Sequence, residues 1–483
     1  MFQIETIETS SLGDRSYLAT DDEVAIVVDP QRDIDRVLDL IAELGVRVSH
    51  VVETHVHNDY VSGGRELAQR TGAAYVLPAH SDVDFDHAAV SDGEVLEAGS
   101  MRLQALHTPG HTHHHVSYAL TDTAGQAEAV FTGGSMLYGA TGRTDLVSPE
   151  DTTALTHAQY HSVRRLAQQL PAGTAVYPTH GFGSFCSATP TTGDRSTVGE
   201  QEHENPALTL GEQDYVNTLL AGLDAYPAYY TRMSPINRHG PAPVDLSTPG
   251  PVDPSELRRR IEAGEWVVDL RERTAFAAGH LSGTVGFELS KNFVTYLGWL
   301  YRYGSPLTLI GDSETQIADA RRELVRIGID DLAGAAIGDI TTLADGQALR
   351  SYPVRDFAGL AEAMGRGPVQ VLDTRRNDER AKGYVRGSQH IPLHELHQRR
   401  EEVPAGEVWV HCGSGYRASI AASVLDHPGQ QVVLVDDSYD NAKEAGLETD
   451  DLTALATAVS RSRAYSLRTG AGNRTVVPMR KAR

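Results

Sequence analysis

The 483-residue sequence is poor in cysteine, in long apolar runs and in basic charge. Its two cysteines, Cys186 and Cys412, are too few for a disulfide framework, which favours a reducing compartment. No apolar stretch approaches the roughly 20 residues that a membrane-spanning helix needs. The first residues lack the basic and apolar regions of a signal peptide. We therefore expect a cytoplasmic protein with no membrane partner.

The charge balance is strongly acidic, with 42 basic against 65 acidic residues and a net charge of −23. Such a field disfavours nucleic acid and anionic membranes as main partners. The exception is the tail at residues 466–483, which is basic and has no acidic residue; we interpret it as a mobile terminus. The composition leaves the oligomeric state open, a homo-oligomer included.

The length predicts roughly three domains. Residues 1–240 alternate short β-like runs with helical patterns, as in the strand at 23–29 and the helix at 33–44. This alternation predicts a layered α/β fold whose sites lie in the loops after strands. Residues 241–254 are rich in proline and predict a linker.

An internal repeat follows the proline-rich stretch. Val-Val-Asp-Leu-Arg at 267–271 recurs as Val-Leu-Asp-Thr-Arg at 371–375, roughly 100 residues later. Each copy is preceded by a helical pattern and followed by an apolar strand and a further helix. We predict two small doubly wound α/β domains, at residues 255–350 and 351–465.

The second copy carries a cysteine loop between a strand at 408–411 and a helix. Loop N–H groups at a helix N-terminus favour a thiolate and bind oxyanions, and Arg417 adds positive charge. We predict Cys412 as a nucleophile and Arg417 as an anion contact. The residues of the predicted cradle are Gly413, Ser414, Gly415 and Tyr416.

This Cys-x-x-Gly-x-Arg loop, with Leu-Asp-Thr-Arg and Gly-Ser-Gln-His-Ile-Pro nearby, resembles a rhodanese (sulfurtransferase) domain. The resemblance implies that Cys412 accepts a sulfane sulfur as a persulfide and passes it to a nucleophile. It also implies that Asp373 and Arg375 support the loop. The first copy reads Gly311-Asp-Ser at the corresponding place, without a thiol, and resembles an inactive rhodanese domain.

Four histidines in the first 240 residues lie in loops that follow strands or turns. His55 and His57 stand two apart in Thr-His-Val-His-Asn-Asp-Tyr, His111 follows Thr-Pro-Gly, and His180 lies in Pro-Thr-His-Gly. Imidazoles that converge in this way suit Zn or Fe. The spacing predicts a metal site built on His55, His57 and His111. The run at 113–115 is interpreted mostly as local composition, with contact of one of its members with the site as the alternative.

These motifs resemble the metallo-β-lactamase fold, in the branch that includes glyoxalase II and the persulfide dioxygenases. The resemblance implies an αββα sandwich over residues 1–240. The whole order, with two rhodanese units behind, resembles persulfide dioxygenase–rhodanese fusions. It implies oxidation of low-molecular-weight thiol persulfides to sulfite at one iron, and exchange of sulfane sulfur with thiosulfate through Cys412.

The sequence departs from that family at two places. Gly134 stands where the family has an aspartate ligand, and Tyr60 stands where a two-metal site has a histidine. Both changes argue against a two-metal hydrolase. They leave a three-histidine Fe(II) site, a site with Asp59 or Asp145 as substitute ligand, or a site poor in metal. Restoring the carboxylate by Gly134→Asp should then tighten iron binding.

The leading hypothesis is therefore a persulfide dioxygenase coupled to a thiosulfate sulfurtransferase, with mononuclear Fe(II). Zn or no metal is the alternative for the cofactor. For the activity, the alternatives are a sulfurtransferase with a degenerate first domain and a glyoxalase II-like hydrolase. The expected neighbours of the metal ligands are Asp59, Tyr60, His180 and Asp145. Cys186 is interpreted as a buried structural cysteine, with a thiol on the substrate side as the alternative.

Overall fold

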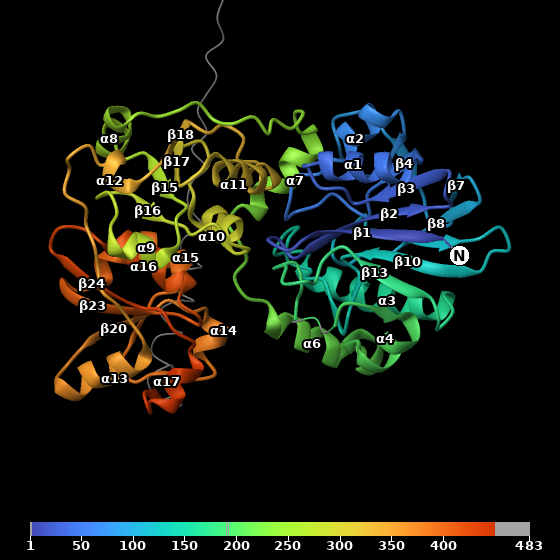
Figure 1. The fold of residues 1–483 in the computed structure, drawn as a ribbon. Coiled ribbons are helices and arrows are strands. Elements are labelled where there is room, and N and C mark those ends of the chain that lie inside the picture. The colour runs from blue at the N-terminus through green and yellow to red at the C-terminus, as the bar shows by residue number, and fades with distance from the viewer. Residues whose placement is uncertain (1, 190, 192, 450–483) are drawn as a thin grey trace, which may run out of the picture. The chain divides into compact units, whose positions relative to one another are not determined.

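The computed structural model describes residues 2–189, 191 and 193–449. It divides into two compact units, Met1–Ser351 and Tyr352–Arg483 (Figure 1). The predicted basic tail at 466–483 and the end of the second predicted rhodanese domain lie outside the described residues. In the described part of the chain, no helix is long and apolar enough to cross a membrane.

Two six-stranded sheets form the first part of the first unit. The first sheet has, in order, β1 (Gln3–Thr9), β2 (Asp14–Thr20), β3 (Val24–Val28), β4 (Arg47–Val52), β5 (Ala74–Pro78) and β6 (Ala88–Val90). The second has β14 (Ser196–Thr197), β13 (Ala175–Pro178), β10 (Ala127–Gly133), β9 (Val116–Thr121), β8 (Met101–His107) and β7 (Val95–Ala98). A short hairpin, β11 (Met136–Leu137) and β12 (Ala140–Thr141), follows β10.

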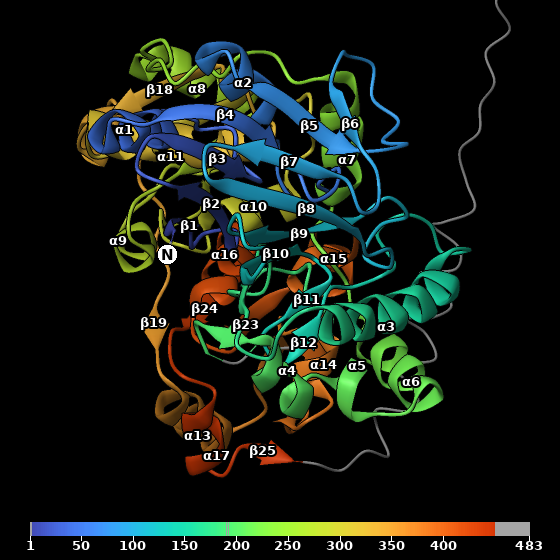
Figure 2. The ribbon, with the colours of Figure 1, turned by 90° about the vertical axis from the view of Figure 1, so that its right-hand side faces the viewer.

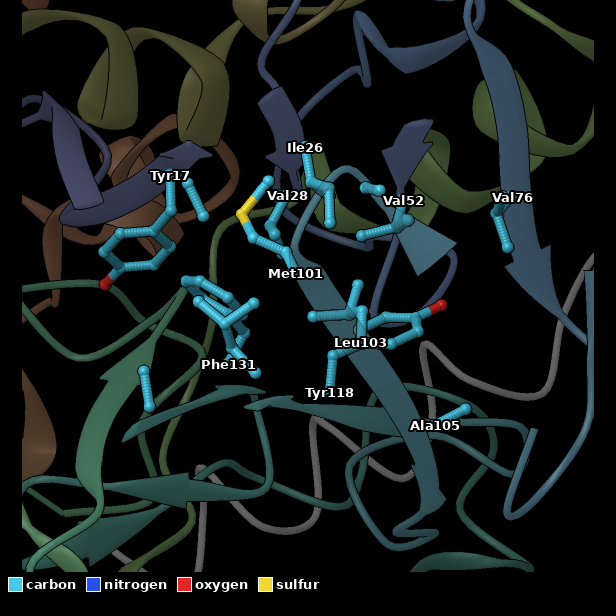
Figure 3. Packing of buried hydrophobic residues seen from close by; sticks show 14 of the residues in the cluster. Tyr17, Ile26, Val28, Val52, Val76, Met101, Leu103, Ala105, Tyr118 and Phe131 are labelled. Carbon is cyan, nitrogen blue, oxygen red and sulfur yellow. The ribbon is translucent and has the colours of Figure 1, made fainter. Parts of the chain in front are cut away.

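The core lies between these two sheets (Figure 3). Successive side chains of a strand point to opposite faces, so every second residue can enter the core. Met101 and Leu103 of β8 do so from one sheet, and Ile26 and Val28 of β3 from the other. Apolar side chains at alternate positions of both sheets therefore pack between them and hold the sheets face to face.

Helices cover the outer faces of both sheets (Figures 1 and 2). The first sheet is covered by α1 (Asp35–Leu44) and α2 (Gly64–Thr71). The second is covered by α3 (Thr152–Gln169), α4 (Val198–Glu204), α5 (Pro206–Thr209) and α6 (Glu212–Gly222). The order helix, sheet, sheet, helix confirms the predicted αββα sandwich. A further helix, α7 (Tyr230–His239), leads into the proline-rich stretch.

The first repeat is a parallel sheet of β16 (Val285–Gly286), β15 (Trp266–Asp269), β17 (Leu307–Gly311) and β18 (Gly334–Ile337). Its helices are α8 (Pro254–Glu262), α9 (Arg273–Ala278), α10 (Phe293–Leu300), α11 (Glu314–Arg326) and α12 (Ile340–Leu343). The predicted linker ends inside this domain. Pro251 pairs with Ala335 in a parallel bridge, and the N–H of Val252 donates to the Ala335 carbonyl at 2.8 Å.

The second unit has the same parallel order with one more regular strand. Its sheet contains β19 (Val354–Arg355), β24 (Gln430–Val435), β23 (Gly406–His411), β20 (Gln370–Asp373) and β22 (Gln389–His390). A small antiparallel pair joins β21 (Tyr384–Val385) to β25 (Glu448–Thr449). The helices are α13 (Phe357–Arg366), α14 (Asn377–Arg380), α15 (Leu393–Arg399), the 3-10 turn Arg400–Glu402, α16 (Tyr416–Leu425) and α17 (Asp440–Glu444).

The sandwich and the first repeat form one compact unit rather than two separate domains. Arginines at their interface reach carboxylates across it. Arg326 of α11 lies 2.6 Å from Asp33, and its carbonyl accepts the N–H of Val61 at 2.7 Å. Arg322 likewise lies 2.6 Å from Asp35. The first repeat therefore packs against the sandwich close to the predicted metal loop, because Val61 directly follows Tyr60.

Candidate functional site

The predicted metal residues all lie in loops at one edge of the sandwich. His55 and His57 follow β4, His111 lies between β8 and β9, and His180 follows β13. Each of these side chains is at most 1% exposed. The parallel and antiparallel strand ends thus bring four imidazoles from distant parts of the sequence into one buried cluster.

His55 is at the centre of this cluster. Its ring centroid lies 4.1 Å from that of His57, 4.8 Å from that of His111 and 5.3 Å from that of His180. Its Nε2 is 3.4 Å from Nε2 of His180. Two nitrogens bound at about 2.1 Å to one tetrahedral ion would be about 3.4 Å apart. His180, expected only as a neighbour of the ligands, therefore belongs to the cluster itself.

Two ring nitrogens of this cluster fit a metal ion. In the described part of the chain, Nδ1 of His57 and Nε2 of His111 are buried and have no hydrogen-bond partner. The other nitrogen of each ring is held: Nε2 of His57 is 3.1 Å from Glu53, and Nδ1 of His111 donates to the Arg143 carbonyl at 2.7 Å. Fixing one ring nitrogen so that the other faces an ion is the usual arrangement of metal-binding histidines.

His55 and His111 are neutral at ordinary pH. Burial, with the neighbouring imidazoles, holds the pKa of His55 well below its usual range. Burial and His180 lower the pKa of His111 to about 3. A neutral imidazole has a free electron pair for a metal, so these two ligands need lose no proton on binding.

His57 and His180 are held by carboxylates. Burial alone would lower the pKa of His57, but Asp29 and Glu53 raise it well above its usual value. In the same way Asp59 and Asp14 overcome burial and raise the pKa of His180 to about 9. Nδ1 of His180 is 2.9 Å from Asp14 and 3.0 Å from Asp59.

Tyr60 supports His57 instead of offering a second-site histidine. Its ring stacks on that of His57 with centroids 4.3 Å apart. Its hydroxyl donates to the Asp29 carbonyl at 3.2 Å and lies 3.0 Å from Nε2 of His57. Burial raises the pKa of Tyr60 well above its usual value, so the phenol keeps its proton. Asp59 and His180 are therefore left without the other histidine of a second metal site.

The imidazole of His111 packs directly against Gly134. A Cβ built on Gly134 would overlap the imidazole, lying 2.6 Å from Cγ and 2.8 Å from Nε2 of His111. The N–H of Gly134 donates to Nε2 of His115 at 3.0 Å. Gly134→Asp would therefore first have to displace His111. The simple gain in metal binding expected from the sequence does not follow from this geometry.

Asp145 lies away from the histidines as an ion-pair partner of Arg143. Its two oxygens are 2.7 Å from Nε and 2.8 Å from Nη2 of that arginine. Because the Arg143 carbonyl receives the hydrogen bond of His111, Asp145 acts on the cluster only through this arginine. It is not the substitute ligand considered from the sequence.

Sequence reasoning missed two residues of the cluster. His115 is buried, and its ring stacks on that of His55 with centroids 5.0 Å apart. The amide of Asn237 in α7 donates to the carbonyls of His57 at 3.0 Å and Tyr60 at 2.8 Å. The run at 113–115 contained a signal for His115, since it directly precedes a strand, whereas Asn237 had no local signal.

The cysteine loop lies in the second unit, between β23 and α16. Cys412 is 1% exposed. Gly415 has a φ of 86°, and a Cβ there would overlap the Asp436 carboxylate, so the loop requires glycine at this position. The Gly413 carbonyl accepts the N–H of Tyr439 at 3.0 Å, which fixes the loop from the other side. The loop at residues 413–416 is therefore held from both sides next to the buried Cys412.

Arg417 is paired with a carboxylate. Its guanidinium makes two hydrogen bonds to Glu379, of 2.5 Å and 2.7 Å. Burial acts to raise the pKa of Glu379, but Arg417 holds it at about 2, so the carboxylate stays ionised. The predicted anion contact thus has an internal anion already bound to it, which the sequence did not reveal.

Asp373 pairs with His411, directly before Cys412, and forms a buried ion pair with Arg375. Nη2 of Arg375 is 2.8 Å from Asp373 and donates to the Gly383 carbonyl at 2.8 Å. The first repeat has the same ion pair, where Arg271 is 2.7 Å from Asp269. Because the first repeat has no cysteine and still keeps this ion pair, the pair stabilises the fold and takes no part in sulfur transfer.

Comparison with known families matches both the sandwich and the second repeat. Residues 14–180 match the metallo-beta-lactamase superfamily, and residues 356–445 match the rhodanese-like domain. The chain is 30% identical over 213 residues to the human mitochondrial persulfide dioxygenase ETHE1, which covers 44% of this chain and 75% of that protein. This chain belongs to the metallo-β-lactamase–rhodanese fusion family that includes the persulfide dioxygenases.

Two further relatives show how far the likeness extends. A solved metallo-beta-lactamase structure from Staphylococcus aureus has a TM-score of 0.63 at 27% identity and covers 70% of this chain and 99% of its own. That share is larger than residues 1–240 alone, which are half of the chain. A hydroxyacylglutathione hydrolase from Pseudomonas aeruginosa is 35% identical over 136 residues, which span 28% of this chain and 48% of the hydrolase.

Proposed function

We propose that this protein is a persulfide dioxygenase with one Fe(II), coupled to a sulfurtransferase that works through Cys412. Its substrates are low-molecular-weight thiol persulfides, its product is sulfite, and thiosulfate exchanges sulfur with Cys412. The observation that carries this proposal is a pair of buried ring nitrogens, on His57 and His111, that have no hydrogen-bond partner among the described residues and whose rings lie within 5 Å of that of His55. They provide for one ion, while Tyr60 and Gly134 leave a second site short of two of its ligands.

In this proposal His55, His57 and His111 hold the ion, with His180 beside them. The iron would supply the binding of O₂ and of the persulfide. The chain's own groups keep the imidazoles in place: Glu53 holds His57, and the Arg143 carbonyl holds His111. Their burial keeps bulk water from the persulfide, which water and other thiols would otherwise consume.

Cys412 would carry the transferred sulfur in the second unit. Its sulfur attacks the outer sulfur of thiosulfate, the S–S bond breaks, and sulfite leaves with the electron pair. The N–H groups of the loop and the start of α16 stabilise the negative charge of the persulfide that remains. A thiol then takes the outer sulfur and regenerates Cys412. Joining both activities in one chain raises the effective concentration of the shared intermediate.

One observation favours the alternative of a sulfurtransferase with a metal-poor sandwich. The proton on His180, shared between Asp14 and Asp59, balances the buried carboxylates without any metal. In that case the histidine cluster would only shape the fold. A glyoxalase II-like hydrolase is less well supported, since it needs both metal sites.

The test is O₂ uptake with glutathione persulfide on protein loaded with Fe(II), together with the iron content. We expect one iron per chain, O₂ consumption with formation of sulfite, and loss of both iron and uptake in His55→Ala. His113→Ala is the matched control, because that histidine is exposed. Full thiosulfate sulfurtransferase activity without O₂ uptake would establish the alternative. Two metals per chain would revive the hydrolase.

A further inference from the structure

Cys186 lies beside the histidine cluster, in the loop that follows His180. Its side chain is fully buried. Together with His111 and His180 it can offer three ligand atoms that lie within 4.8 Å of one another. Neither the sulfurtransferase chemistry nor the three-histidine site uses this thiol.

The backbone of Arg143 holds Cys186 and His111 next to each other. Its N–H donates to the Cys186 carbonyl at 2.8 Å, and its own carbonyl accepts Nδ1 of His111 at 2.7 Å. Gly142 and Ser187 form an antiparallel bridge beside these contacts. The spacing of thiol and imidazole is therefore set by regular backbone pairing and not by a flexible side chain.

The cluster also lacks an anionic ligand at the place where its family has one. Gly134 has no side chain, and the space above it is filled by His111. The Nε2 of His111 is buried and, among the described residues, without a hydrogen-bond partner. The electron pair on this nitrogen is therefore available to bind a metal ion next to the buried thiol.

We propose that Cys186 is a thiolate ligand of the metal and supplies the negative charge that Gly134 lacks. This inference rests on the proposed function, because it adds a ligand to the ion of the histidine cluster, on the side of His111 and His180. When a divalent ion binds, the S–H bond breaks, a metal–sulfur bond forms and one proton leaves to the buffer. A thiolate with imidazoles selects a borderline-soft cation such as Fe(II), Zn(II) or Co(II) over Mg²⁺ or Ca²⁺.

The three ligand atoms have to draw together when the ion binds. A nitrogen at about 2.1 Å and a sulfur at about 2.3 Å from one tetrahedral ion are about 3.6 Å apart. Separations of up to 4.8 Å therefore need to close by up to about 1.2 Å. The backbone of Cys186 stays paired with Arg143 while the side chains of Cys186 and the two histidines rotate.

Co(II) loading of the full-length protein tests the proposal without any measurement of activity. The chain has two cysteines, so Cys412→Ser leaves Cys186 as its only thiol. We expect this variant to bind one Co(II) and to show a thiolate-to-cobalt charge-transfer band in the near ultraviolet. The band should be absent in Cys186→Ser, with the visible bands of the histidine-bound ion retained and an affinity at least about tenfold lower.

The outcomes separate this proposal from the proposed function. One bound Co(II) with visible bands but no charge-transfer band in Cys412→Ser overturns the thiolate ligand and leaves a histidine site intact. That result does not depend on whether Cys186→Ser folds. No binding of Co(II) or Fe(II) overturns both proposals. Cobalt binding with the band, but no O₂ uptake by the iron-loaded protein, overturns the dioxygenase alone.

Discussion

The two rhodanese-like repeats have the same sheet but use the segment after the central strand differently. Ile310 pairs with Asp269 in the first repeat as His411 pairs with Asp373 in the second. This register places Gly311 at the position of Cys412. The same register places Gln316 at the position of Arg417, and Ala275 at the position of Glu379. The thiol, the guanidinium and the carboxylate are thus absent together from the first repeat.

The helix that follows shows what the first repeat does instead. In the second repeat most residues of α16 are buried in its own core. In the first repeat the C-terminal end of α11 carries Arg322 and Arg326 to the sandwich, and the Arg326 carbonyl holds Val61 beside the metal loop. The difference teaches that the repeat without a thiol serves as a support: Arg322 and Arg326, called the brace below, join it to the sandwich.

The largest effect should come from the thiol itself. Cys412→Ser should reduce thiosulfate-to-cyanide sulfur transfer to the rate without enzyme, because no other residue of the second repeat can form the persulfide. Adding Gly311→Cys to this variant should not restore transfer, since Gln316 and Ala275 replace the charged pair. Sulfur transfer in the double variant above that of Cys412→Ser would contradict the distinction between the repeats.

The second-largest effect should come from removing Arg326 of the brace. Arg326→Ala leaves the buried Asp33 without its closest partner, and breaking a buried ion pair costs about 3 kcal/mol. Urea unfolding monitored by circular dichroism should show this loss, whereas the hydrogen bond from Val61 to the main-chain carbonyl of residue 326 is kept in the variant. Arg259→Ala, at an exposed arginine of the same repeat, is the control and should cost less than about 0.5 kcal/mol. Equal losses in the two variants would refute the brace.

The brace should also respond to acid. Burial acts to raise the pKa of Asp33, but Arg326 and Arg36 hold it below its ordinary value. A carboxylate with a lowered pKa stabilises the fold above its ordinary pKa of about 3.9, and this contribution is lost as the pH falls further. The difference in unfolding free energy between the natural protein and Arg326→Ala should therefore shrink below about pH 4. A constant difference from pH 7 to pH 3 would show that Asp33 is not the partner that matters.

The smallest effect concerns the carboxylate in the cysteine loop. Glu379→Gln removes the internal anion that competes with thiosulfate for Arg417. Taking about 1 kcal/mol for this partly buried pair, we expect the KM for thiosulfate to fall by about fivefold. Glu362→Gln, which breaks an exposed pair with Arg366 in the same unit, should leave KM unchanged. A rise in KM would mean that Glu379 positions Arg417 for the anion instead of competing with it.

Much of this organisation was predictable from the sequence, because strand ends and glycine-rich turns are local signals. The sandwich, the repeat, the loop of Cys412 and the histidines at 55, 57 and 111 follow from such patterns. The brace was not predictable, since Arg322 and Arg326 look like the solvated face of any amphipathic helix. The pair of Arg417 and Glu379 was also missed, because 38 residues separate its partners.

The strand edge at Pro251 has a practical consequence for shortened versions of the protein. Proline has no N–H to donate, so it suits the outermost row of a sheet and keeps a further strand from adding there. Cutting the chain inside the proline-rich stretch would strip this row from the first repeat and separate Asp33 from Arg326. A gene fragment that ends near Ser351 keeps the strand edge at Pro251 and the pair of Asp33 and Arg326. It is the better starting point for isolating the unit that contains the histidine cluster.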